Sequence, residues 1–382
     1  MLDFALTDEQ NHLVHTVRRF VRDRIIPIAA ASDRDASFPK SVYDEAFELG
    51  LVAPLIPSEY GGIGLSELDH VLLTEELAYG CTGIQTSITC TMLAATPIQL
   101  AGKTELQKKY LGLLASEPTY AAYALTEPAA GSDAAGIQLR ARKHGDEWVL
   151  NGQKCYITNG SWARFFVVFG TVDPEQRHRG IMAFVVDADA PGVRVGKKER
   201  KMGQRASDTA TILFEDVKVP AANVLAEEGY GFKLAMSTFD RTRPDIGAGA
   251  CGLMRRALDE SVAYAKERTS FGVPIAEHQM VQSMISNMAI RYEATRLLVH
   301  KAAWLVDRGS KNSLIASYSK AFGGDSAMEV ATDAVQVFGG AGYIEDYPVE
   351  KLMRDAKILQ IYEGTSQIQR MVIARNILAG AR

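Results

Sequence analysis

The chain has 382 residues, enough for two or three domains whose cores need neither a disulfide nor a metal to hold them together. Its 42 basic and 46 acidic side chains give a formal net charge of -4, which offers no overall attraction to nucleic acid or anionic lipid. No apolar run approaches the roughly 18 residues that cross a bilayer. We therefore expect no nucleic-acid partner and no membrane span.

The cysteines and the amino terminus bear on where the protein works. The four cysteines lie far apart without a C-x-x-C pair, so neither a disulfide framework nor a zinc ribbon is indicated, and a reducing compartment fits. The chain opens with an acidic helix-capping segment around Asp8, which argues against a signal peptide. We expect a cytoplasmic protein of a bacterium or archaeon, with a mature mitochondrial matrix protein as the alternative.

Residues 1–120 have the pattern of a helical domain. Apolar side chains recur at helical spacing between Leu13 and Ile25, behind the capping box Thr7-x-x-Gln10. A later helix is expected to open at Ser66 and close at Gly80, because serine favours the first position of a helix and glycine its end.

Residues 121–228 have the texture of a compact β domain. Short β-branched or aromatic runs appear at 165–169, 181–186 and 210–214, separated by glycine, proline and aspartate. The dipeptide Asn151-Gly152 lies between two such runs and predicts a hairpin with a type I′ turn.

Residues 229–382 return to the helical period. Helices are expected near 281–305, 313–337 and 366–378, which together predict a helical bundle. Residues 247–252 match G-x-G-x-x-G, but helical sequence surrounds them where a dinucleotide fold requires a strand, so close helix packing is the better interpretation. The scattered histidines have no metal-ligand spacing and no G-x-S-x-G motif occurs, so we expect neither a metal site nor a hydrolase.

Two segments combine turn residues with hydroxyl and aromatic side chains. In 123–133, Pro128 and Gly131 interrupt regular structure and leave backbone N–H groups free to bind an anion or a heterocycle, although an ordinary turn is the alternative. In 152–160, Tyr156 and the neighbouring Thr158 hydroxyl could stack on and bond a planar ring, with a plain sheet residue as the alternative.

A third segment, 361–367, joins two predicted helices and contains Glu363 and Gly364. A glycine lets a ligand approach the backbone closely, and a preceding carboxylate could act as a base. The alternative is that Glu363 only complements the dipole of the following helix.

These three segments resemble, in order, the signature segments of the acyl-CoA dehydrogenases. The matching runs are Thr126-Glu-Pro-Ala-Ala-Gly-Ser132-Asp133, Gly152-Gln-Lys-Cys-Tyr-Ile-Thr158-Asn-Gly160 and Gln360-Ile-Tyr-Glu363-Gly-Thr-Ser-Gln367. The likeness continues through 239–244, 267–272, 277–279 and 335–340, so it covers almost the whole chain. It is closest to the short- and medium-chain members.

The resemblance implies an α+β fold with an N-terminal helical domain, a middle β domain that is barrel-like or made of orthogonal sheets, and a C-terminal four-helix bundle. It also implies FAD-dependent α,β-desaturation of an acyl-CoA in fatty-acid β-oxidation. Glu363 would remove the α-proton and the β-hydrogen would pass as hydride to flavin N5. The electrons would go to an electron-transfer flavoprotein, and relatives suggest a homotetramer.

The resemblance further assigns binding residues. Residues lining the flavin or meeting the FAD phosphates or ribose would be Tyr123, Thr126, Ser132, Tyr156, Ile157, Thr158, Thr365 and Gln367. Residues reaching the FAD of a neighbouring subunit would be Arg268, Phe271, Gln279, Gln336 and Gly340. Residues contacting the acyl-CoA would be Ser132, Asp240, Arg243, Tyr362 and Gly364.

The sequence departs from the family pattern at Tyr156, where many relatives have tryptophan, and at Ala129, where glycine is common. Small side chains at Thr86, Thr89 and Cys90 suggest room for a longer or branched acyl chain. The alternatives are an oxidase, a non-oxidative member of the fold or one specialised for branched or cyclic acyl-CoAs. A binding protein that retains CoA or flavin affinity without turnover is a further alternative.

Overall fold

A computed structural model describes residues 4–380 of the chain. Its N-terminal part is helical, as predicted, and Thr7 and Ser66 both form complete capping boxes. A π-helical turn, Val21–Ile25, joins the first two helices. The helices are α1 (Asp8–Phe20), α2 (Ile26–Arg34), α3 (Lys40–Glu48), α4 (Glu67–Gly80), α5 (Thr82–Ala101) and α6 (Thr104–Ser116).

The middle part is one eight-stranded sheet in the order β6-β7-β3-β2-β4-β5-β8, with β1 paired parallel to β4. Its strands are β1 (Ala121–Ala124), β2 (Arg140–His144), β3 (Glu147–Thr158), β4 (Phe165–Thr171), β5 (Ile181–Asp187), β6 (Val193–Lys198), β7 (Thr209–Pro220) and β8 (Val224–Ala226). β4 is buried along its whole length because helices α5 and α6 contribute to the same apolar core. The three predicted strand runs fall in β4, β5 and β7 and are confirmed.

The predicted hairpin at Asn151-Gly152 is wrong. These residues lie inside the continuous strand β3, and the turn falls instead at Gly145, between β2 and β3, where φ is 59°. Asn151-Gly152 marks a bulge, where the register against β7 shifts between Leu150 and Gly152. A side chain at Gly152 would meet the Leu139 backbone at 2.9 Å, so the glycine serves close packing.

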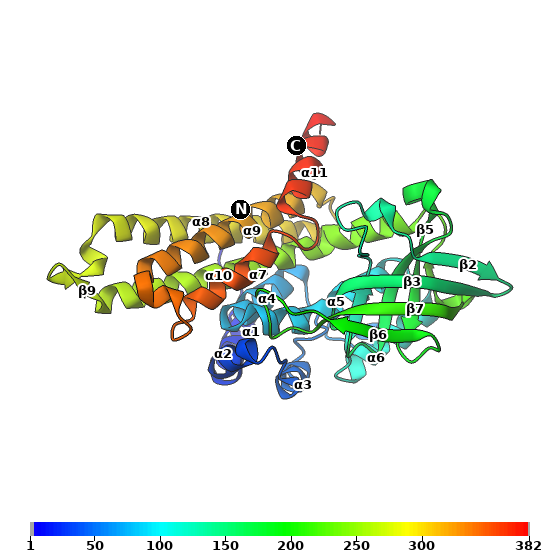
Figure 1. Ribbon diagram of the computed structural model, residues 1–382, viewed down its shortest axis with the longest axis horizontal. Coiled ribbons are helices and arrows are strands. Elements are labelled where there is room, and N and C mark those ends of the chain that lie inside the picture. The colour runs from blue at the N-terminus through cyan, green and yellow to red at the C-terminus, as the bar shows by residue number, and fades with distance from the viewer. Residues whose placement is uncertain (1–3, 381–382) are drawn as a thin grey trace.

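The C-terminal part is a bundle of α7 (Gly231–Glu267), α8 (Gln279–Asp307), α9 (Ser313–Phe338) and α10 (Val349–Leu359). The short strands β9 (Thr269–Ser270) and β10 (Val273–Pro274) close one end, and α11 (Ser366–Leu378) projects away from the bundle (Figure 1). The glycines of 247–252 lie in the middle of α7. A side chain at Gly252 would collide with the Glu75 carbonyl of α4, so close helix packing explains the motif.

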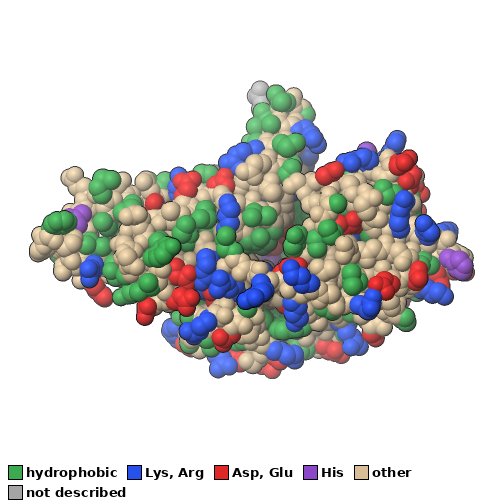
Figure 2. Space-filling view, viewed as in Figure 1, with side chains coloured by type: hydrophobic (Ala, Val, Ile, Leu, Met, Phe, Trp, Pro, Cys, Tyr) green, Lys and Arg blue, Asp and Glu red, His purple; other side chains and the backbone are tan. Residues whose placement is uncertain are grey.

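The surface bears charges of both signs, and basic side chains gather near the centre of the face drawn in Figure 2, between the bundle and the β domain. Within residues 4–380, no helix combines the length and apolar character needed to cross a membrane.

Candidate active site

A cavity of about 590 Å³ lies where α5, the ends of β1 and β3, the loop 199–207, α7 and α10 meet. All three segments singled out from the sequence reach it. Its lining includes Gln85, Thr86, Thr89, Cys90, Leu93, Tyr123, Leu125, Thr126, Tyr156, Ile157, Thr158, Phe239, Thr242, Asp245, Ile246, Tyr362 and Glu363. Arg200, Lys201, Arg354 and Lys357 add a basic part to the wall.

Glu363 lies in the turn between α10 and α11 with a left-handed backbone, φ 53°. Such a conformation is costly for a residue other than glycine and persists only where its surroundings impose it. Here the Glu363 carbonyl accepts bonds from Arg243 Nε (3.3 Å) and Gln369 Nε2 (3.2 Å), and the next carbonyl accepts one from Lys320 Nζ (2.7 Å). These bonds fix the side chain toward the cavity.

The Glu363 carboxylate accepts a hydrogen bond from Thr242 Oγ1 at 2.9 Å. Burial raises the pKa of Glu363 to about 7, and the nearby Asp245 charge adds to this, whereas Thr242, Arg243 and Lys320 oppose it. A carboxylate with this pKa is a stronger base than an ordinary glutamate and is still substantially ionised at neutral pH. Among the described residues, the Glu363 backbone N–H has no hydrogen-bond acceptor.

Five of the residues expected to line a flavin are in the cavity wall, namely Tyr123, Thr126, Tyr156, Ile157 and Thr158. The Tyr123 hydroxyl is buried and has no hydrogen-bond partner among residues 4–380, although its ring packs on Phe169 and Phe239. An unsatisfied buried donor of this kind fits a ligand with an acceptor atom. Tyr156 is 65% exposed and offers an uncovered aromatic face.

The other expected residues of this set lie outside the lining. Ser132 is exposed in the turn after Thr126, and Gln367 is exposed on α11. Thr365 caps α11 by accepting a bond from Ile368 N at 3.2 Å.

The turn that carries Thr126 is held by a buried ion pair. Lys154 Nζ contacts Glu127 Oε1 at 2.7 Å and donates to the Leu125 carbonyl at 2.9 Å. Glu127 also accepts bonds from the backbone N–H groups of Gln138 and Leu139. Burial lowers the pKa of Lys154 to about 8, although the Glu127 charge opposes the shift.

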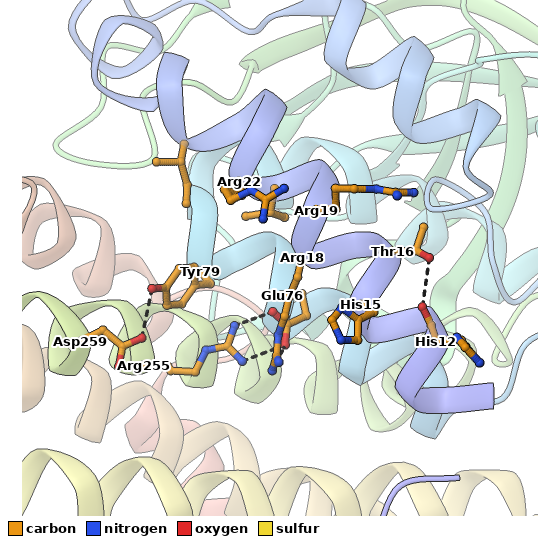
Figure 3. Close-up of a pocket in the computed structure, with 12 residues that line it drawn as sticks. His12, His15, Thr16, Arg18, Arg19, Arg22, Glu76, Tyr79, Arg255 and Asp259 are labelled. Carbon is orange, nitrogen blue, oxygen red and sulfur yellow. Dashed lines mark hydrogen bonds and ion pairs between the residues drawn. The ribbon is translucent and has the colours of Figure 1, made fainter. Parts of the chain in front are cut away.

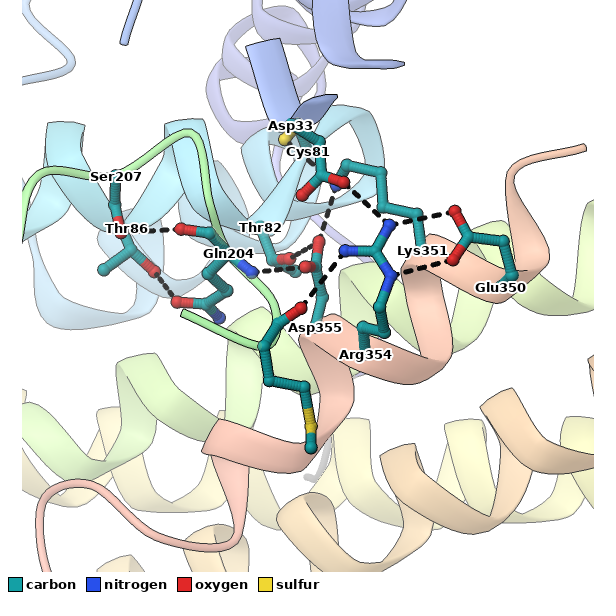
Figure 4. Close-up of polar contacts among 11 residues, drawn as sticks. Asp33, Cys81, Thr82, Thr86, Gln204, Ser207, Glu350, Lys351, Arg354 and Asp355 are labelled. Atoms are coloured by element: carbon teal, nitrogen blue, oxygen red, sulfur yellow. Dashed lines mark hydrogen bonds and ion pairs between the residues drawn. The ribbon is translucent and has the colours of Figure 1, made fainter. Parts of the chain in front are cut away.

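A second polar cluster holds the loop that closes the cavity (Figure 4). Asp355 of α10 accepts bonds from Thr82 Oγ1 (2.9 Å) and Lys351 Nζ (2.6 Å), and from the Gln204 backbone N–H. The Gln204 side chain in turn accepts a bond from Thr86 of α5 at 3.0 Å. The three segments that form this wall are therefore bonded to one another.

Of the residues expected to contact the acyl-CoA, Tyr362 lines the cavity and Gly364 follows Glu363 with φ 90°. Arg243 is only 4% exposed, and its guanidinium bonds Asp240 Oδ1 at 3.0 Å as well as the Glu363 carbonyl. In this structure Arg243 and Asp240 therefore support the turn that carries Glu363.

The five residues expected to serve a neighbouring subunit lie far from the cavity, at the end of the bundle that carries β9 (Figure 1). Arg268 follows α7, and Phe271 is 98% exposed between β9 and β10. Gln279 begins α8, and Gln336 and Gly340 lie at the end of α9 and just beyond it. The structure gathers them at one end of the bundle but does not bring them to Glu363.

The sequence analysis missed Thr242, Asp245, Lys320 and Gln369. Thr242 lies one helical turn from Phe239 and one from Asp245, so its place within the likeness at 239–244 was the available signal. No signal in the sequence marked Lys320 or Gln369. Each donates to a backbone carbonyl, and such a contact can be recognised only in the folded chain.

A second cavity, of about 880 Å³, lies between α1, α4 and α7 and is lined by several arginines (Figure 3). Two of them, Arg18 and Arg255, are paired with Glu76, at 3.0 and 2.6 Å. None of the predicted site residues lines it. Across residues 4–380, no three His, Cys, Asp or Glu side chains are grouped as metal ligands would be.

Comparison with known proteins agrees with this geometry. Models of the N-terminal, middle and C-terminal domains of acyl-CoA dehydrogenase match residues 7–118, 122–217 and 229–378. The probable mitochondrial medium-chain specific acyl-CoA dehydrogenase 2 of Caenorhabditis briggsae is 47% identical, over 99% of this chain and 92% of its own.

Two solved structures superpose closely over 99% of this chain and 100% of theirs. Butyryl-CoA dehydrogenase from Megasphaera elsdenii is 40% identical, with a TM-score of 0.96. A chain from work on the electron transferring flavoprotein of Acidaminococcus fermentans and flavin-based electron bifurcation is 42% identical, also with a TM-score of 0.96. The chain therefore belongs to the acyl-CoA dehydrogenase family and has its three-part fold.

Proposed function

We propose that the protein is an FAD-dependent acyl-CoA dehydrogenase that introduces an α,β double bond into an acyl-CoA thioester. The observation that carries the proposal is Glu363, a carboxylate whose pKa burial raises to about 7, on the wall of the cavity that Tyr123 and Thr158 also line. Bound FAD would supply the hydride acceptor for the β-hydrogen.

The chain's own residues perform the proton transfer. Glu363 accepts the α-proton of the thioester, and the bonds from Arg243 and Gln369 to its carbonyl hold it at the position of attack. Charge that develops on the thioester oxygen needs a donor, and the uncommitted backbone N–H of Glu363 is suited to that role. Apolar walls such as Leu93 and Phe239 exclude water.

Tyr123, Thr126, Tyr156, Ile157 and Thr158 would hold the flavin ring, with the Tyr123 hydroxyl as a donor. Ser132, Thr365 and Gln367 would meet more distant parts of FAD. Arg200 and Lys357 in the lining suit the phosphates of CoA. The neighbouring Arg354 and Lys201 are bonded to other residues of the chain.

The remaining assigned residues support sharing of FAD between subunits. Arg268 lies 26 positions beyond Thr242 on the nearly continuous α7, or about 39 Å along the helix. One dinucleotide cannot reach both ends of that span. Arg268, Phe271, Gln279, Gln336 and Gly340 would therefore bind the FAD of another subunit, most simply in a homotetramer.

An electron-transfer flavoprotein is the proposed electron acceptor, supported by the solved neighbour from Acidaminococcus fermentans. This assignment puts the protein in fatty-acid β-oxidation, in a bacterial or archaeal cytoplasm or a mitochondrial matrix. The rival within the fold is an acyl-CoA oxidase. Rapid peroxide formation in air during turnover would favour the oxidase.

The test is anaerobic bleaching of bound FAD by a panel of straight, branched and cyclic acyl-CoAs. Glu363→Gln keeps the shape of the side chain but removes the base, so flavin reduction should fall by about a hundred- to ten-thousandfold while FAD and acyl-CoA still bind. Glu199→Gln removes another carboxylate from the same cavity wall and should lose far less. Near-normal reduction by Glu363→Gln overturns the proposal.

A further inference from the structure

A polar pair lies beside Glu363 on the cavity wall. Helix α7 presents Phe239, Thr242 and Asp245 to the cavity at successive turns, so Asp245 lies one turn beyond the residue that bonds the base. The Asp245 side chain is 14% exposed, and its Oδ2 lies 3.3 Å from Nε2 of His70 on α4. Its other oxygen, Oδ1, has no hydrogen-bond partner within residues 4–380.

His70 is 1% exposed, and its Nδ1 has no partner in the described part of the chain either. Burial alone would lower the pKa of His70, but the charges of Asp245 and Glu67 outweigh burial and raise it. His70 and the Asp245 carboxylate therefore lie side by side, and charge on one favours charge on the other. Asp245 Oδ1 is buried without a partner within residues 4–380, and the Asp245 side chain contributes to the cavity wall.

The neighbouring wall is polar as well. Gln85 of α5 donates to Thr89 Oγ1 at 2.8 Å, and both residues line the cavity. A side chain added at Gly249, one turn beyond Asp245, would come within 3.3 Å of Gln85 Oε1, so α5 and α7 close together here. This part of the cavity wall is thus formed by α5 and α7 and carries accepting oxygens.

An unbranched alkyl chain suits such a wall poorly. The chain would displace water from the Asp245 carboxylate without replacing the lost hydrogen bonds. An unsatisfied buried charge is among the costliest groups in a protein. A hydrogen-bond donor on the acyl chain would instead bond the Asp245 carboxylate. A carboxylate on the chain would meet Asp245 as a like charge.

We propose that Asp245, backed by His70, selects acyl-CoA thioesters whose acyl chain carries a hydrogen-bond donor, a hydroxyl or an ammonium, beyond the β-carbon. The inference rests on the proposed dehydrogenase function and names its substrate class. Asp245 acts as a specificity-determining residue and does not itself accept the α-proton.

The test uses the FAD-loaded enzyme and anaerobic flavin bleaching with matched substrates. These are pentanoyl-CoA, its ω-hydroxy and ω-amino derivatives and glutaryl-CoA, together with the corresponding hexanoyl series. In at least one series a donor-bearing substrate should exceed the plain one by about tenfold or more in kcat/KM, with the carboxylate poorest. The hydroxy and amino arms show which donor is preferred.

Three outcomes are distinguishable. Bleaching by plain acyl-CoAs as fast as by donor-bearing ones in both series overturns this inference and leaves the dehydrogenase function standing. No bleaching by any substrate overturns both. A preference for the donor supports both.

Variants identify the residue responsible. Asp245→Val should remove the preference for the donor and favour the plain chain. If the valine variant does not fold, Asp245→Asn is the substitute, because it keeps the side-chain shape, and it should weaken the preference. Thr89→Val removes a wall hydroxyl that Gln85 already bonds, so it should change all substrates alike. An unchanged substrate ratio in a folded Asp245 variant rejects the role, because a purely structural residue would not set that ratio.

Discussion

The hydrogen bond between Thr242 and Glu363 should set the pH at which the enzyme works. It is 2.9 Å long and stabilises the ionised carboxylate, so Thr242→Val should raise the pKa of Glu363 above its value of about 7. A bond to a charged group contributes about 1.5 to 3 kcal/mol and one pH unit corresponds to about 1.4 kcal/mol. Because Glu363 is partly exposed to the cavity, we expect the lower end, a rise of about one unit.

The sign follows from the proposed role of Glu363 as the base. In that role only the carboxylate accepts the α-proton, so flavin reduction should rise with pH through the pKa of Glu363, and the variant should need a higher pH. At neutral pH the variant should reduce flavin about fivefold more slowly, and the two rates should converge near pH 10. Anaerobic stopped-flow bleaching across the pH range measures both midpoints.

The matched control is Thr238→Val, one turn earlier on α7, because the Thr238 hydroxyl bonds its own helix at Leu234 and not Glu363. Its midpoint should equal that of the wild type. An unmoved midpoint in Thr242→Val, or an equal shift in the control, would refute the reasoning.

Two further predictions concern stability and assembly. Lys154→Met should lower the free energy of unfolding by about 3 to 5 kcal/mol in urea titrations, because Glu127 is left buried without its cationic partner. Adding Glu127→Gln should restore part of that free energy, and no recovery would contradict the ion-pair argument. Arg268→Ala and Glu363→Gln should each be inactive alone, yet mixed oligomers should regain roughly a quarter of wild-type activity if two subunits share each site. A co-expressed mixture that stays inactive would exclude sharing.

Local sequence rules predicted well those helices and strands whose signals lie within a single segment of the chain. The capping boxes at Thr7 and Ser66 and the strand runs of the middle part depend on neighbouring residues, and the structure contains them. Asn151-Gly152 misled because the same dipeptide suits a tight turn and a bulge. The choice between them depended on Leu139, the residue before β2, packing against Gly152, a contact that no local pattern reveals.

The site shows the same limit. The resemblance pointed to Glu363, but its bond to Thr242 spans 121 positions. The contact between His70 and Asp245 joins two helices whose packing cannot be predicted from the sequence. Periodicity could only mark His70 as a histidine in a largely apolar helix. Its unsatisfied nitrogen became visible only once α4 and α7 were packed.

Base strength and substrate choice are coupled through α7. Thr242 lowers the pKa of Glu363 and Asp245 raises it, from adjacent turns of one helix. A substrate donor that bonds Asp245 would offset part of its negative charge, which lowers the pKa of Glu363 and ionises the base. A donor-bearing substrate would thereby increase the ionised fraction of Glu363, whereas a plain alkyl chain would leave more of Glu363 protonated. For the same reason Asp245→Val should shift the pH midpoint downward, opposite to Thr242→Val.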